Sequence, residues 1–195
     1  MRLFIALDID ESIRERIGLF QDGVRGFAEE AGWVRPESLH VTLKFIGEKS
    51  DDAVSDIQRA LAQIAVNKFS LTFRGVGFFP TAKSARVFWV GIESGPELSL
   101  LAQNIDAAME RLGIPKESHA YTPHLTLARG PRKSGSPRRQ ASDGANNTFA
   151  RLQERLSRMA TPEFGTMTAQ AFFLYQSKMQ RGGAQYTKLA RFELS

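Results

Sequence analysis

The sequence predicts an α+β fold made of two similar lobes that face each other across a cleft. Segments with strand patterns and segments with helical patterns are mixed along the whole chain. A pattern of His, apolar residue, Thr and Leu occurs twice, at 40–43 and at 124–127, and a predicted helix precedes it in each half. The two copies start 84 residues apart in a chain of 195 residues, close to half its length, as expected for two similar lobes.

The first half of the chain predicts strands and helices in mixed order. Leu3–Ile9 has the pattern of a mostly buried strand. Apolar residues recur at helical spacing over about Glu11 to Glu30, and we expect a break near Gly23. A second helix is expected to begin at Ser50 or Asp51. Further strands are predicted at about 39–46, at Phe69–Phe73 and at Arg86–Glu93, with a loop or bulge around Gly75, Gly77 and Pro80.

The second half repeats this mixture. A helix is predicted from Pro96 to about Leu112, where Gly113 ends it, before the second motif strand at about 123–129. Residues 131–146 hold four cations among Gly, Ser and Pro and predict a flexible basic loop. The chain then predicts a helix over about Asn147–Met159, a strand at Met167–Tyr175 and a strand at Tyr186–Leu194, the two strands forming a hairpin with a turn at 180–183.

The composition is ordinary for a globular protein, with 42% hydrophobic and 24% charged residues. Cysteine is absent, which excludes disulfides, thiolate zinc sites and a cysteine nucleophile and fits a reducing compartment. No apolar run approaches the roughly 20 residues that span a bilayer, and the N-terminus has the pattern of a strand rather than of a signal peptide. We therefore expect a cytoplasmic protein with no membrane association.

The charge balance points towards polyanions. The formal net charge is +5 and the sequence pI is near 9.7, which favours partners such as nucleic acid. A basic surface without a specific partner explains the charge equally well.

Each motif is expected to present an imidazole and a hydroxyl from one face of a strand. Side chains two apart in a strand share a face, so His40 and Thr42 point one way, as do His124 and Thr126. The intervening apolar residues should anchor the opposite face in a core, namely Val41, Leu43 and Phe45 in the first strand and Leu125 and Leu127 in the second.

Two such pairs suit the chemistry of a phosphodiester. Imidazole titrates near neutral pH, so one ring can accept a proton while the other donates one. Threonine hydroxyls can donate hydrogen bonds to the non-bridging oxygens as charge develops on them. The paired motifs therefore predict an acid–base site for a phosphate ester, although a single histidine on a strand is usually structural.

The motifs resemble those of the two-histidine (2H) phosphoesterase superfamily. Within it, HVTLKFIG at 40–47, TPHLTLAR at 122–129 and the opening RLFIAL at 2–7 are similar to the bacterial RNA 2′,3′-cyclic phosphodiesterases, also named 2′-5′ RNA ligases. The resemblance covers nearly the whole chain, as a single domain over 1–195. It implies two pseudo-symmetric α+β lobes, each an antiparallel sheet with helices outside, around a basic active-site cleft.

The resemblance also implies an activity and roles for five residues. The activity is metal-free hydrolysis of RNA 2′,3′-cyclic phosphate ends to a 2′-phosphate, with no cofactor. His40 matches the proton donor to the departing 3′ oxygen, and His124 matches the proton acceptor that activates water. Thr42 and Thr126 match the phosphate-binding hydroxyls, and Arg129 matches a cation near the phosphate. We expect the partner to be an RNA or oligonucleotide with a 2′,3′-cyclic phosphate end, and the protein to be a monomer.

Several points stay open at this stage. Strict alternation places Arg129 on the core face of its strand, so it reaches the site only if the strand twists or ends near Ala128. Lys44 shares the nominal face of His40 and is expected to touch substrate or to face solvent. His119 is expected on the surface, and Pro123 argues against a zinc pair with His124. The aromatic that stacks the terminal base is Phe45, Phe79, Tyr121 or none of them.

Two alternative functions remain. The same two histidines could run the reaction backwards and join RNA ends through a 2′-5′ linkage. Alternatively, the cleft could bind RNA or a nucleotide without catalysis, although two intact motifs argue against this.

Overall fold

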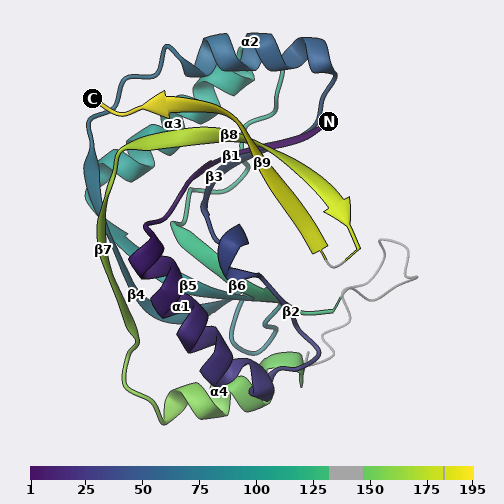
Figure 1. Ribbon diagram of the computed structural model, residues 1–195, viewed down its shortest axis with the longest axis vertical. Coiled ribbons are helices and arrows are strands. Elements are labelled where there is room, and N and C mark those ends of the chain that lie inside the picture. Colours follow the sequence, from purple (N-terminus) through teal and green to yellow (C-terminus); the bar gives the residue numbers. More distant parts are fainter. Residues whose placement is uncertain (132–146, 182) are drawn as a thin grey trace.

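Two antiparallel sheets form the frame of the described part of the chain (Figure 1). The computed structural model describes residues 1–131, 147–181 and 183–195. The first sheet has the strand order β3-β1-β8-β9 and the second the order β2-β6-β5-β4-β7. The strands are β1 (Arg2–Leu7), β2 (Gly32–Trp33), β3 (Val41–Glu48), β4 (Phe69–Phe79), β5 (Val87–Ser94), β6 (His124–Arg129), β7 (Glu163–Ala169), β8 (Ala171–Gln180) and β9 (Gly183–Glu193).

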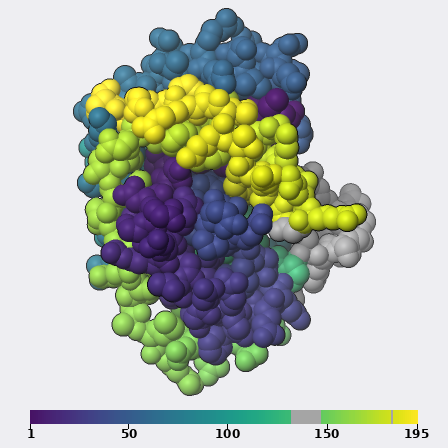
Figure 2. Space-filling view, in the orientation of Figure 1, coloured from purple at the N-terminus to yellow at the C-terminus, as the bar shows by residue number. Residues whose placement is uncertain are grey.

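Helices cover the outer sides of the two sheets, which confirms the two-lobed α+β fold. In Figure 1, α2 and α3 lie with the first sheet and α1 and α4 with the second. The space-filling view shows α1 across the face of the second lobe and β9 running over the first (Figure 2). The helices are α1 (Glu11–Val24), α2 (Asp51–Leu61), α3 (Pro96–Glu110) and α4 (Ala150–Ser157), with short 3₁₀ turns η1 (Arg25–Phe27), η2 (Pro36–Ser38) and η3 (Asn147–Phe149).

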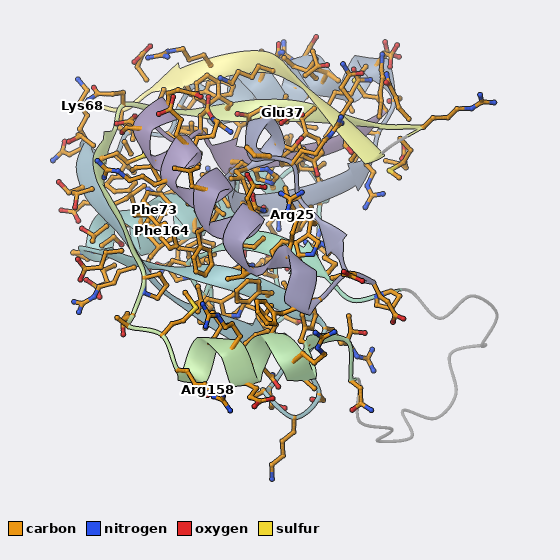
Figure 3. The ribbon with its side chains drawn as sticks, turned by 60° about the horizontal axis from the view of Figure 1, so that its bottom comes forward. Arg25, Glu37, Lys68, Phe73, Arg158 and Phe164 are labelled. Atoms are coloured by element: carbon orange, nitrogen blue, oxygen red, sulfur yellow. The ribbon has the colours of Figure 1, made fainter. Side chains whose placement is uncertain are left out.

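The two sheets share one strand–helix–strand unit. In the first sheet β1 leads through α1 to β3, which pairs antiparallel with β1. In the second sheet β5 leads through α3 to β6, which pairs antiparallel with β5. Each connecting helix leaves its own sheet, because α1 packs against β7 of the second sheet and α3 against β3 of the first. Phe73 and Phe164 fill the core beneath α1 (Figure 3).

Both motif strands contain a β-bulge at the same place. In the first sheet Ile5 pairs with Lys44 and Ala6 with Thr42, so Leu43 is the extra residue. In the second sheet Phe88 pairs with Ala128 and Trp89 with Thr126, so Leu127 is the extra residue. A bulge of this kind reverses the alternation of the side chains beyond it. Consequently, Lys44 and Phe45 in β3 and Ala128 and Arg129 in β6 lie on faces opposite to those expected from the sequence.

Some boundaries differ from the sequence expectations. The first helix ends at Val24 and a 3₁₀ turn follows, so the break expected near Gly23 is confirmed. The segment around Gly75 is a bulge within β4, where this glycine has φ of +72°. The single strand predicted at Met167–Tyr175 is wrong, because the chain leaves the second sheet after β7 and enters the first with β8. Apart from Pro131, the predicted basic loop at 131–146 lies outside the described residues.

Candidate active site

The two motif histidines are oriented by the same local hydrogen bond. His40 follows η2, and its Nδ1 lies 2.8 Å from the carbonyl oxygen of Ser38. His124 begins β6, and its Nδ1 lies 2.8 Å from the carbonyl oxygen of Thr122. A carbonyl oxygen only accepts, so each Nδ1 must carry the proton. This arrangement leaves Nε2 of both rings for proton exchange with a substrate.

The surroundings of the two motifs are matched residue by residue. His40 and Thr42 are half-buried, as are His124 and Thr126, while the Val41 and Leu125 side chains are in the core. Neither ring is sealed inside its lobe. We call the side of β3 and β6 that carries these two histidines and two threonines the motif surface.

Arg129 lies within electrostatic range of both rings. The bulge at Leu127 turns its side chain away from the core face, and it is exposed at the end of β6. Its positive charge lowers the pKa of His40 and also that of His124. The two motif strands also contact each other, which brings the two motifs close together. The bulge at Leu127 is thus the strand distortion that Arg129 needs to leave the core face.

Burial lowers the pKa of both histidines. Burial is the main cause that lowers the pKa of His124; the Thr122 carbonyl opposes this and Arg129 reinforces it. The pKa of His40 is also lowered, chiefly by burial and also by Arg129 and Arg14, against the Ser38 carbonyl and Asp8. Both rings are thus biased towards the neutral form when no anion is bound.

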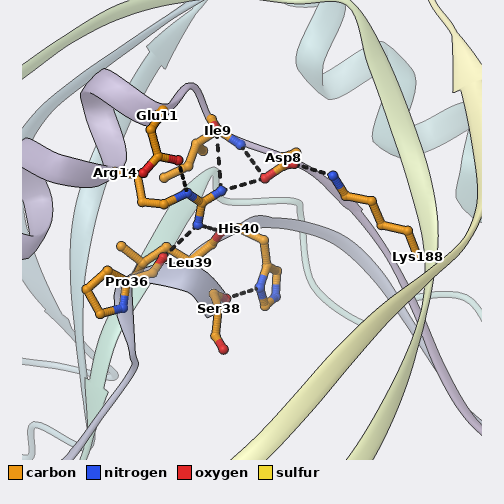
Figure 4. Close-up of polar contacts among 9 residues, drawn as sticks. All are labelled: Asp8, Ile9, Glu11, Arg14, Pro36, Ser38, Leu39, His40 and Lys188. Carbon is orange, nitrogen blue, oxygen red and sulfur yellow. Dashed lines mark hydrogen bonds and ion pairs between the residues drawn. The ribbon is translucent and has the colours of Figure 1, made fainter.

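A polar network supports the backbone ahead of His40 (Figure 4). Arg14 of α1 donates to the carbonyl oxygens of Pro36 at 2.6 Å and Leu39 at 3.3 Å. The same guanidinium donates to Asp8 Oδ1 at 2.7 Å, and Lys188 donates to Asp8 Oδ2 at 2.5 Å. Burial would raise the pKa of Asp8, but these cations and the Ile9 amide lower it overall. Sequence reasoning missed this network.

The bulge at Leu43 exchanges the expected positions of two residues. Lys44 is only 2% exposed rather than at the substrate or in solvent, and its Nζ donates to Asp106 Oδ1 at 2.5 Å and to the Pro115 carbonyl at 2.9 Å. Phe45, expected in the core, is 55% exposed and lies opposite Phe4 on the side of His40. Both expectations from strict alternation were wrong for the same reason.

The three candidate aromatic residues have different environments. The Tyr121 hydroxyl donates to the Thr42 carbonyl at 3.0 Å and so links the segment before β6 to the first motif. The Phe79 ring packs edge-on against His124, with centroids 4.9 Å apart. Of the three, Phe45 has the exposed ring.

No group of acidic and histidine residues in the described part of the chain could hold a metal ion. His119 is exposed, as expected, and its Nδ1 lies 2.7 Å from Ser118 Oγ. A hollow of about 500 Å³ beside α1 is lined by Arg14 and by the carboxylates of Glu11, Glu15, Asp22 and Glu37, and this excess of negative charge would repel a phosphate.

Comparison with known families shows the same division of the chain into two halves. A sequence model of the LigT-like phosphoesterases matches the chain twice, at 7–89 and at 90–186, once for each half. The chain belongs to the LigT-like phosphoesterase family. The resemblance expected from the paired motifs is thereby confirmed.

Relatives of this LigT-like phosphoesterase match it over nearly its full length. A protein of Archaeoglobus fulgidus named RNA 2′,3′-cyclic phosphodiesterase is 31% identical over 193 residues, which cover 99% of this chain and 100% of the relative. A protein of the same name from Methanothermobacter thermautotrophicus is 29% identical, covering 100% and 99%. The structure of Escherichia coli LigT complexed with 3′-AMP aligns with a TM-score of 0.77 and 28% identity, covering 100% and 98%.

None of the helices in the described segments of this LigT-like phosphoesterase is long and apolar enough to cross a membrane.

Proposed function

We propose that this protein hydrolyses the 2′,3′-cyclic phosphate at an RNA end to a 2′-phosphate, without a metal ion. The names of its full-length relatives and its membership of a phosphoesterase family support this activity. The observation that carries the mechanism is the matched orientation of the two rings, each with Nδ1 held by a carbonyl and Nε2 left for substrate.

In the proposed reaction His124 accepts a proton from water as the water oxygen attacks phosphorus. The bond between phosphorus and the 3′ oxygen breaks, and His40 donates its proton to that oxygen. The hydroxyls of Thr42 and Thr126 and the guanidinium of Arg129 hold the non-bridging oxygens. Acid–base catalysis by positioned groups contributes about 10² to 10⁴ in rate, and the fixed cation adds electrostatic stabilisation.

The lowered pKa values of the histidines fit a substrate-dependent proton donor. His40 must be protonated to donate, yet burial and Arg129 favour its neutral form in the free protein. An arriving phosphate brings a negative charge that offsets Arg129 and favours the imidazolium. We therefore expect anion binding to raise the pKa of His40.

We also propose that Phe45 stacks the base of the terminal nucleotide. Its ring is exposed, and β3 carries it on the same side as His40 and Thr42. Stacking on an aromatic ring is how proteins commonly hold single-stranded RNA ends, and it tolerates different bases.

One assay separates this proposal from the alternatives. The protein is incubated with EDTA and an oligonucleotide that ends in a 2′,3′-cyclic phosphate, and the product isomer is identified. We expect a 2′-phosphate with the unmodified protein and no turnover with His40→Ala or His124→Ala. The exposed His119 provides a matched control, because His119→Ala should leave the rate unchanged.

The other outcomes point elsewhere. A 3′-phosphate product would show that the bond between phosphorus and the 2′ oxygen breaks, which contradicts the assignment of the 3′ oxygen as the leaving group. Binding of the oligonucleotide without turnover would favour a binding module. Joining of a second oligonucleotide with a 5′-hydroxyl would reveal the ligase reaction.

A further inference from the structure

Helix α1, which packs on the second sheet, holds the bulge in β6 through a hydrogen bond. The carbonyl oxygen of Leu127, the extra residue, accepts a hydrogen bond from the Val34 amide at 2.8 Å. It also lies 3.3 Å from Nε2 of Gln21 on α1, and the same Nε2 donates to the Val34 carbonyl at 2.8 Å. One amide group therefore joins the bulge to the strand segment beside it.

This segment borders the residue that the bulge redirects. Just before Val34, Trp33 of β2 pairs with Ala128 and Gly32 pairs with Arg129. A shift of the bulge would alter this pairing and move Arg129, because a one-residue change of register turns a side chain to the opposite face. Gln21 is thus placed to fix the backbone from which the Arg129 guanidinium extends.

The cost of burying Gln21 suggests that it does more than stabilise the helix. It is fully buried, on the same apolar side of α1 as Ile13, Ile17 and Val24. Among the described residues nothing hydrogen-bonds its Oε1. A buried amide oxygen without a partner is unfavourable, and an apolar residue of similar size would avoid that penalty.

We propose that Gln21 is a positioning residue, which acts on the site by holding the β6 bulge and thereby keeps Arg129 at the motif surface. The proposal deepens the proposed function, since it assumes that Arg129 serves the phosphate. Gln21 acts on neither histidine directly, since its amide nitrogen donates to the carbonyls of Val34 and Leu127. Its effect passes through the backbone of Leu127 to the guanidinium two residues further on.

The test measures histidine pKa values by NMR titration, which does not depend on turnover. The charged groups that affect the two rings are Arg129 for both, with Asp8 and Arg14 for His40. Displacing Arg129 should raise both pKa values. We compare the unmodified protein, Gln21→Met, Arg129→Met and the double variant. Gln153→Met serves as the matched control, because the Gln153 amide also donates to a carbonyl, that of Ala82.

We expect Gln21→Met to raise the pKa of His124 in the direction of Arg129→Met, with a melting temperature close to that of the unmodified protein. In the Arg129→Met background the same substitution should cause no further shift, since coupled residues are not additive. Gln153→Met should leave the pKa of His124 unchanged. The kcat/KM for the cyclic-phosphate oligonucleotide should fall about tenfold in Gln21→Met.

An unchanged pKa of His124 in Gln21→Met, or an equal shift in both backgrounds, would overturn the proposal. Gln21→Leu is the second variant, and failure of both variants to fold would also overturn it by showing a purely structural role. If the unmodified protein has no activity, the proposed function fails, while the titration still decides the role of Gln21.

Discussion

The two motif strands have the same backbone and burial but different chemistry after the bulge. The segments 40–45 and 124–129 have the same burial pattern. In each, the first and third side chains are half-buried, the second, fourth and fifth are buried, and the sixth is exposed. The final exposed position holds an aromatic ring in β3 and a guanidinium in β6. The comparison teaches that the duplicated backbone orients the two histidines alike, as the proposed acid–base pair requires. The positions beyond the bulges differ, and in the proposed function they serve different parts of the substrate: Phe45 the terminal base and Arg129 the phosphate.

The largest expected effect separates the roles of the two histidines. A nucleotide nitrophenyl phosphodiester has a leaving group that departs without protonation, so it does not need a general acid. We expect His40→Ala to retain most activity on this substrate, whereas His124→Ala should lose about 10² to 10⁴ in kcat. Release of nitrophenol measures both. Equal losses would break the assignment of donor and acceptor.

The next effect concerns the cation of β6. Arg129→Met should reduce kcat/KM by about 10², because it removes the fixed cation that stabilises the negative charge developing on the phosphate in the transition state. It should also move the pH optimum of kcat/KM upwards. The reason is that Arg129 lowers the pKa of both histidines, so its loss lets both rise. In the unmodified protein the optimum should lie below about pH 6.5, the ordinary imidazole pKa. A pH–rate profile of both proteins provides the measurement, and an optimum that stays in place would contradict this reading.

The buried position after each bulge differs as well, with Lys44 in β3 and Ala128 in β6. Asp106→Ala should destabilise the protein by about 3 kcal/mol, because it leaves the buried Lys44 charge with only the more distant Glu117 carboxylate, at 3.9 Å. Lys44→Met should cost less, since the Asp106 side chain is partly exposed and can be hydrated. Urea denaturation of both variants measures the difference. A larger loss in Lys44→Met would show that the lysine serves mainly as a support for the Pro115 carbonyl.

The smallest effect is expected at the aromatic position of β3. Phe45→Leu should raise KM about tenfold and leave kcat nearly unchanged, because a lost base stack costs about 1 to 3 kcal/mol of binding. Steady-state kinetics with a base-containing and an abasic terminal nucleotide measures the effect, which should disappear with the abasic substrate. A fall in kcat with unchanged KM would place Phe45 in support of His40 instead.

The sequence was sufficient to predict the features that are duplicated along the chain. The paired motifs predicted the two lobes, the family and the common side of each His and Thr, because period-two alternation holds up to Thr42 and Thr126. It was insufficient beyond those residues. A bulge leaves no composition signal in VTLKF or LTLAR, so alternation gave the wrong face for Lys44 and Phe45.

Tertiary contacts account for the other omissions. The Asp8 and Arg14 network depends on α1 passing beneath η2, which no local pattern reveals. The division between β7 and β8 at Gln170 falls inside an unbroken strand-like run. In a similar way, β2 is only two residues long and exists because β6 offers it a partner.

The exchange of helices between the sheets bears on how such a molecule could have arisen. Since α1 packs on the second sheet and α3 on the first, each half on its own would expose the surface that the other half's helix covers. Two copies of a single half could satisfy each other only by trading helices, as in a domain-swapped homodimer. Fusion of such a pair would give a chain with this exchange of helices. After fusion, the residue beyond the bulge could diverge independently in each copy.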